Sequence, residues 1–240
     1  MQTRIEQVRN LKTSAKNQRD RGRKGYERAL TLLGEAIAIA NDELSANPPA
    51  EARLEYAREL SDCHGLMGGV HRRWADEAAT EERTKHLKDS IRAYDKGHRY
   101  ESPEYGIVDS YNLVNRLLVR VLVAPEALTM NADLVLDPDI DPVNLPRAIE
   151  QAAATVHEQL TGSRRGNYWA MADLALLEVL LGRRTATAAY ADFLGASPPD
   201  FALISAIAAL KPLAELKIAV APALGDAVKV LEDRLKLLRA

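Results

Sequence analysis

The 240-residue chain has few of the residues that build cross-linked or thiol-based sites. It contains one cysteine, Cys63, so neither an internal disulfide framework nor a cysteine-rich zinc site is available. A single thiol is consistent with a reducing compartment. Aromatic residues make up only 5% of the chain although 47% of it is hydrophobic, and alanine and leucine supply much of the difference. This balance favours helices over sheets, and the sequence predicts an all-α fold.

Long apolar runs are also absent. No run approaches the roughly 18 apolar residues of a membrane span, and the first twelve residues, MQTRIEQVRNLK, lack the apolar core of a signal peptide. We therefore expect a soluble, cytoplasmic protein that makes no membrane contact.

Charge is unevenly distributed. Residues 1–28 hold nine Lys and Arg against three Asp and Glu, although the whole chain has a net charge of −2. One interpretation is a solvated first helix that neutralises an acidic body. The alternative is a nucleic-acid-binding arm over residues 1–25, although interleaved aromatics for base stacking are missing. The basic residues of that arm are Arg4, Arg9, Lys12, Lys16, Arg19, Arg21, Arg23 and Lys24.

No motif indicates catalysis, a cofactor or a metal. Cys63 and His64 are adjacent, but neighbouring helical residues point about 100° apart, and Cys63 belongs to an apolar stripe. The histidines form no HExxH pair and no set with carboxylates that would define a metal site. The run LDPDIDP imitates the start of a calcium loop whose first position is Asp137, but the sixth position of that loop is Pro142 instead of Gly and the twelfth is Ala148 instead of Glu. The sequence therefore predicts a protein that is not an enzyme.

Helical hairpins dominate the chain instead. Three segments match the +0, +4 and +7 spacing of the second helix of a tetratricopeptide-like repeat. These sets are Ala36, Ala40 and Glu43; Ser90, Tyr94 and Gly97; and Ala186, Tyr190 and Phe193. Prolines at 48–49 and 198–199 follow the first and third sets and end their helices.

The periodicity predicts a right-handed, tetratricopeptide-like α-solenoid of helical hairpins with capping helices at its ends. We expect a basic arm over 1–25, repeats over 26–216, and a capping helix over 217–240 that is also suited to pairing with a second copy. Residues 124–145 break the pattern with three prolines and five acids and are interpreted as an insertion with a short helix around Pro125 to Met130.

Two polar faces lie on the helices expected at 50–76 and 104–123, which we take as first helices of hairpins lining one concave surface. Glycines at 65, 68 and 69 accompany the first face and would admit a neighbouring helix or a bound peptide. Arginine and asparagine can hold a carboxylate or an extended backbone. The predicted partner-binding residues are Arg72, Arg73, Asn112, Arg116 and Arg120, with Tyr111 and Trp169 as further contributors.

The runs LSDCHGLMGGVHRRWADE, SIRAYDKGHRYE, SYNLVNRLLVRVL and YWAMADLALLEVLLGRRTATAAYADFL carry a family resemblance. Over about residues 26–216 the chain resembles bacterial tetratricopeptide-repeat proteins related to the TRAF-binding helical region of mitogen-activated protein kinase kinase kinases. The resemblance implies a non-catalytic scaffold or regulatory module for protein–protein interaction. Its partner would be a protein or peptide, such as a bacterial signalling, defence or effector protein encoded nearby.

Overall fold

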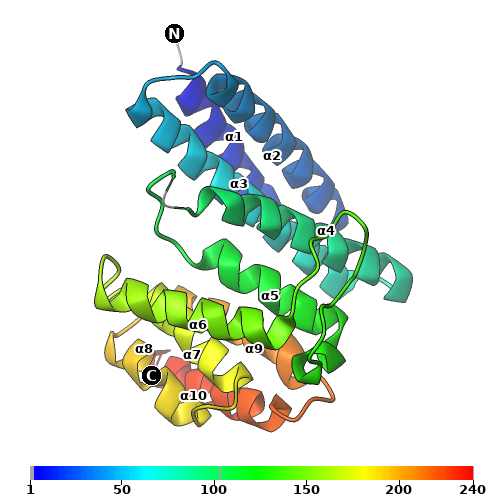
Figure 1. Cartoon of the computed structure of the whole chain (residues 1–240), viewed down its shortest axis with the longest axis vertical. Helices are drawn as coiled ribbons and strands as arrows, with labels where there is room; N and C mark the ends of the chain where they lie inside the picture. The colour runs from blue at the N-terminus through cyan, green and yellow to red at the C-terminus, as the bar shows by residue number, and fades with distance from the viewer. Residues whose placement is uncertain (1–2, 103, 240) are drawn as a thin grey trace. The chain divides into compact units, whose positions relative to one another are not determined.

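The helices that the sequence predicts are present in the computed structural model, which describes residues 3–102 and 104–239 (Figure 1). These residues form ten α-helices and one 3-10 helix, η1, without a strand, so the all-α prediction is confirmed. The elements are α1 (Arg4–Gln18), α2 (Gly22–Ser45), α3 (Ala50–Glu77), α4 (Thr80–Tyr100), α5 (Tyr111–Val123), η1 (Pro125–Thr129), α6 (Leu145–Thr161), α7 (Tyr168–Leu180), α8 (Ala186–Gly195), α9 (Asp200–Ala214) and α10 (Ala221–Arg239).

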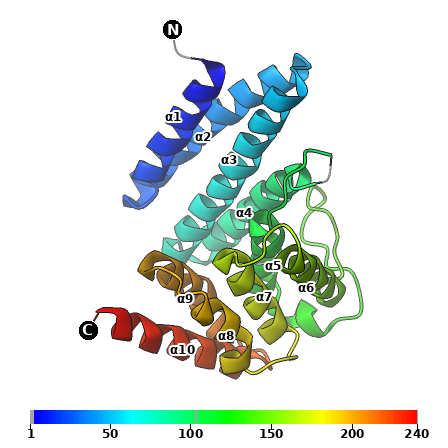
Figure 2. The same ribbon diagram turned by 90° about the vertical axis from the view of Figure 1, so that its left-hand side faces the viewer.

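The chain divides into two compact units, Met1–Val119 and Arg120–Ala240, and the division falls within α5. In the first unit α1 packs on α2 and α3, α2 packs on α3, and α3 packs on α4 (Figure 1, Figure 2). Ala36 and Ala40 in α2 are fully buried, and Tyr94 in α4 is 1% exposed. The +0 and +4 positions of the first pattern and the +4 position of the second are therefore buried, whereas Glu43, the +7 position of the first, is partly exposed.

In the second unit η1 packs on α6, α6 on α7, α7 on α8, and α9 on α10. Helix α10 also contacts α7 and α8. Tyr190 and Phe193, the aromatic positions of the third repeat pattern, are 1% and 0% exposed. The predicted short helix in the insertion is confirmed as η1, and an isolated antiparallel bridge joins Leu134 to Val143.

The proline pairs end helices in the same way in both units. Asn47, before Pro48, has a φ of 53°, and Ser197, before Pro198, has a φ of 52°. Because the residue before proline disfavours the right-handed helical region, α2 ends at Ser45 and α8 at Gly195, before each proline pair.

The predicted start of the helix at 104–123 is wrong, because α5 begins only at Tyr111. Gly106 has a φ of 62°, which a right-handed helix cannot accommodate. Asp109 lies before the helix, and its carboxylate accepts hydrogen bonds from the backbone N–H groups of Ser110 (2.6 Å) and Tyr111 (3.1 Å). Asp109 therefore satisfies free backbone donors at the start of α5.

Gly34 offers a stabilising substitution. It lies exposed in the interior of α2, and a Cβ at this position would meet no atom within 4 Å. Gly34→Ala should raise the free energy of unfolding by about 0.5–1 kcal/mol, since alanine loses less backbone entropy in a helix. Urea denaturation followed by circular dichroism would measure it, and an unchanged or lower stability would contradict the expectation.

Candidate functional site

Three helices of the first unit approach closely at glycines. A Cβ on Gly65 of α3 would lie 2.7 Å from Asn112 Oδ1, and one on Gly97 of α4 would lie 2.7 Å from three Asn112 atoms. At Gly68 a Cβ would lie 2.8 Å from the Tyr94 ring. Side chains of α4 and α5 thus fill the space beside the glycines. Of the two roles considered for the α3 glycines, the structure shows the close approach of neighbouring helices.

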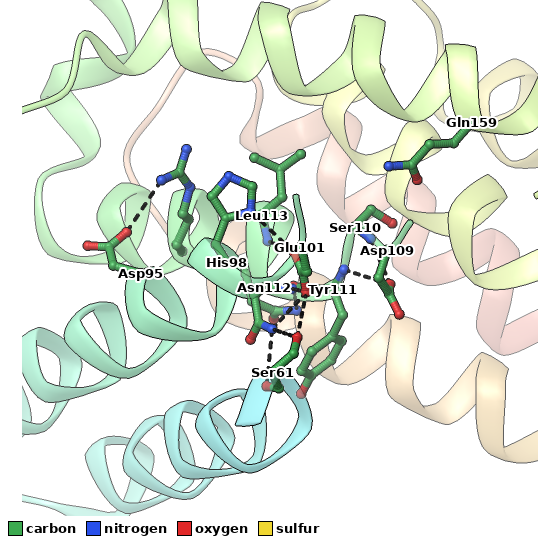
Figure 3. Close-up of polar contacts among 12 residues, drawn as sticks. Ser61, Asp95, His98, Glu101, Asp109, Ser110, Tyr111, Asn112, Leu113 and Gln159 are labelled. Carbon is green, nitrogen blue, oxygen red and sulfur yellow. Dashed lines mark hydrogen bonds and ion pairs between the residues drawn. The ribbon is translucent and has the colours of Figure 1, made fainter. Parts of the chain in front are cut away.

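Asn112 occupies the centre of this contact and is 1% exposed. Its Nδ2 donates to Glu101 Oε1 (2.7 Å) and to Ser61 Oγ (3.0 Å), and its backbone N–H also donates to Glu101 Oε1 (3.1 Å) (Figure 3). The second Glu101 oxygen accepts from the Leu113 backbone N–H (3.3 Å) and lies 3.2 Å from His98 Nδ1. Glu101 therefore caps the first turn of α5, and Asn112 links α3, α4 and α5. A partner in solution cannot reach a side chain buried in this way.

Three predicted residues, Arg72, Arg73 and Tyr111, form a surface on α3 and α5 together with Asn115, which was not predicted. This surface is here called the Tyr111 face. Arg72 Nη1 donates to Asn115 Oδ1 (3.4 Å). A Cβ on Gly69 would lie 3.4 Å from Arg73 Nη1 and 3.7 Å from the Tyr111 hydroxyl, so both side chains converge on that glycine. Tyr111 is 47% exposed and meets Tyr94 edge-on. The face therefore presents guanidinium groups beside an accessible aromatic ring.

Arg116 and Arg120, the two arginines of α5 that were predicted to bind a partner, do not belong to this face. Arg116 extends to α4, where its Nη1 lies 3.6 Å from Asp95 Oδ1. Arg120, in the second unit, is 2% exposed, and its Nη2 donates to the backbone carbonyl of Asp141 (3.4 Å). This hydrogen bond joins the insertion at residues 124–145 to α5. The polar residues predicted on this helix therefore do not share one exposed surface.

Trp169 lies at the start of α7 in the second unit and is 37% exposed. Its ring centroid is 6.0 Å from that of Phe201 in α9, which is 58% exposed. Tyr168 lies beside Trp169 at 5.3 Å between ring centroids. Trp169 therefore belongs to an exposed aromatic patch.

The basic arm makes ion pairs with acidic residues of the first unit. Arg9 Nε lies 2.9 Å from Glu59 Oε1, and Lys12 Nζ lies 2.7 Å from Asp62 Oδ2, which joins α1 to α3. Further pairs join Arg9 to Glu55, Lys12 to Glu59, Arg4 to Glu43, Arg19 to Asp20, and Arg23 to Glu27 and Glu82. The exposed Lys16, Arg21 and Lys24 make no such pair among the described residues. This arrangement agrees with the interpretation of α1 as a helix that neutralises acidic neighbours.

Cys63 and His64 face buried surroundings in α3. Burial raises the pKa of the Cys63 thiol to about 12 and lowers the pKa of His64 to about 4. Both groups are therefore neutral near pH 7. Cys63 is packed into the hydrophobic core with Leu60 and Val70.

A possible metal-binding group was missed in the sequence. His71, His86 and Asp89 each offer a ligand atom, and these atoms lie within 4.8 Å of one another. The sequence contained one indication of this group: Asp89 follows His86 by three residues, so the two side chains lie on the same side of α4. His71 belongs to α3, and only the packing of α3 on α4 brings it to the pair.

Comparisons with protein-family models, with curated proteins and with solved structures find no match to this chain. The resemblance to tetratricopeptide-repeat proteins stays a prediction. No helix in the described part of the chain has the length and apolar character needed to cross a membrane.

Proposed function

We propose that this protein is a non-catalytic interaction scaffold that binds a protein or peptide partner through the Tyr111 face. The observation that carries the proposal is the 47% exposure of Tyr111 beside Arg72 and Arg73. Tyrosine and arginine are enriched among residues that dominate binding energy at protein interfaces. Guanidinium and amide groups can also bind carboxylates and extended backbones through directed hydrogen bonds.

The scaffold is a right-handed α-solenoid of tetratricopeptide type. The consecutive packing of helices within each unit and the proline-terminated hairpins support this assignment. The exposed patch around Trp169 provides a second contact area, because aromatic side chains supply large rigid surfaces. The partner is a signalling, defence or effector protein encoded nearby, as the family resemblance implies.

The Tyr111 face can be tested by removing its ring and one guanidinium together. Affinity capture from the native host followed by mass spectrometry identifies the partner, which is then purified and titrated calorimetrically. The double variant Arg72→Ala/Tyr111→Ala should weaken binding by more than about tenfold, since it removes one aromatic contact and one charge-assisted contact.

A matched control is Arg58→Ala. Arg58 is exposed on the same helix, 14 residues or about 21 Å before Arg72, and its loss should leave the dissociation constant unchanged. Circular dichroism would verify that both variants are folded. A folded double variant that binds its partner as tightly as the parent would refute the face as the binding site.

A further inference from the structure

A histidine pair links α3 to α4 in the first unit, outside the Tyr111 face. The Nδ1 atoms of His71 and His86 lie 3.1 Å apart. Asp89 lies one turn after His86 on α4, and its carboxylate completes a group of ligand atoms within 4.8 Å of one another. His86 is buried, whereas His71 and Asp89 are partly exposed. The group is thus accessible from one side.

The spacing suits a small tetrahedral ion. Two nitrogens bound to one zinc ion at about 2.0–2.1 Å in tetrahedral geometry are about 3.3 Å apart. The ion would lie beside the line between the two Nδ1 atoms, and the imidazoles would tilt toward it.

Neighbouring side chains hold the ligands in place. The Trp74 ring stacks on His86 with 4.1 Å between centroids, and Trp74 in turn stacks on Tyr26 with 5.8 Å between centroids. Glu82 Oε1 lies 3.9 Å from Nε2 of His86, the nitrogen that does not face His71. A carboxylate near the second ring nitrogen of a ligand histidine fixes its orientation and favours the tautomer with a free Nδ1 lone pair.

The carboxylate of Asp89 is oriented by Arg92, which is not one of the three ligand residues. Arg92 Nη1 donates to Asp89 Oδ1 (2.8 Å), and Arg92 is one turn further along α4. This contact orients the carboxylate and leaves its second oxygen for a ligand bond.

We propose that His71, His86 and Asp89 bind one divalent transition-metal ion of the zinc class. Imidazole and carboxylate ligands suit zinc, whereas magnesium and calcium prefer sites built from oxygen atoms. Three protein ligands leave a fourth position for water or an anionic ligand. The ion would cross-link α3 and α4. In its absence, the 3.1 Å contact is a single N–H···N hydrogen bond between two neutral rings.

The stacking of Trp74 on His86 provides a direct readout. The chain has two tryptophans, so Trp169→Phe leaves Trp74 as the only one. Chelator-treated protein of this background is titrated with Co²⁺, and Zn²⁺ is then added. We expect one equivalent of Co²⁺ to bind, to quench Trp74 fluorescence and to give the visible absorption of four-coordinate cobalt, and Zn²⁺ to displace it.

Substitution of single ligand residues tests whether the metal ion binds at His71, His86 and Asp89. His71→Ala and Asp89→Asn should each weaken Co²⁺ binding by about 100-fold or more, because even outer-shell partners contribute 10- to 100-fold. His157→Ala is the matched control, since His157 is exposed on α6 in the second unit, and it should bind as the parent does. Both ligand variants retain Trp74 and His86, so the fluorescence readout remains available in each. Circular dichroism would verify that both are folded.

Two results would overturn the proposal. One is an absence of Co²⁺ and Zn²⁺ binding by the folded parent at millimolar metal. The other is binding that His71→Ala and Asp89→Asn leave unchanged, which would place the ion elsewhere. Either result would assign the His71–His86 contact to a hydrogen bond alone.

Discussion

Glu101→Ala is expected to lower the free energy of unfolding by about 3–5 kcal/mol. The Glu101 side chain is 1% exposed, and its carboxylate accepts hydrogen bonds from three donors of α5: the Asn112 and Leu113 backbone N–H groups and Asn112 Nδ2. Alanine leaves these donors without their acceptor in a region closed to water. Asn112 Nδ2 keeps its hydrogen bond to Ser61 Oγ (3.0 Å), so the two backbone N–H groups dominate the effect, because an unsatisfied buried donor destabilises by about 1–3 kcal/mol.

Equilibrium urea denaturation would measure this change. The matched control is Glu104→Ala, which removes an exposed carboxylate three residues later and should shift stability by no more than about 0.5 kcal/mol. Glu101→Gln keeps one acceptor oxygen and should fall between the two. A loss below about 1 kcal/mol for Glu101→Ala would show that water or other groups replace the carboxylate as the cap of α5.

Helix boundaries were predictable where local chemistry determines them. Proline pairs at 48–49 and 198–199 end α2 and α8 through steric effects on the residue before each pair, and the sequence displays those prolines directly. The start of α5 was missed because Ile107 continues the apolar period of the helix into the preceding turn. Two residues in the sequence indicated the later start: Gly106, whose positive φ is incompatible with a right-handed helix, and Asp109, whose carboxylate binds backbone N–H groups at the start of α5.

The surroundings of polar residues were less predictable. Helical periodicity places Asn112 opposite the apolar stripe of α5, which normally means exposure. The side chain is buried because Gly65 of α3 and Gly97 of α4 leave room for it and because Glu101 supplies an acceptor. Each contribution comes from another helix, so it depends on packing that no local pattern contains.

The candidate metal group shows the same limit. His86 and Asp89 were recognisable as a pair on one side of α4, but two ligands do not define a site. His71 comes from α3, and the hairpin between the two helices sets its distance from His86. In contrast, Arg73 and Tyr111 were both predicted for partner binding and converge on Gly69. Periodicity alone would have put Tyr111 on the apolar stripe of its helix, and its 47% exposure depends on how α5 packs.

The chain's two phenylalanines provide a matched test of core packing in the second unit. Phe193 is 0% exposed, whereas Phe201 is 58% exposed. Phe193→Ala should lower the free energy of unfolding by about 3–5 kcal/mol, because it removes a large apolar group and leaves a cavity. It also removes an edge-to-face contact with Tyr190, whose ring centroid is 6.2 Å away.

Phe201→Ala deletes the same atoms from a largely solvated position beside Trp169 and should lower stability by less than about 1 kcal/mol. Urea denaturation of both variants would give the difference directly. Equal losses would contradict the assignment of Phe193 to the core. A large loss confined to Phe193→Ala would support its inward role at the last position of the +0, +4, +7 pattern, since the two variants differ only in where the ring lies.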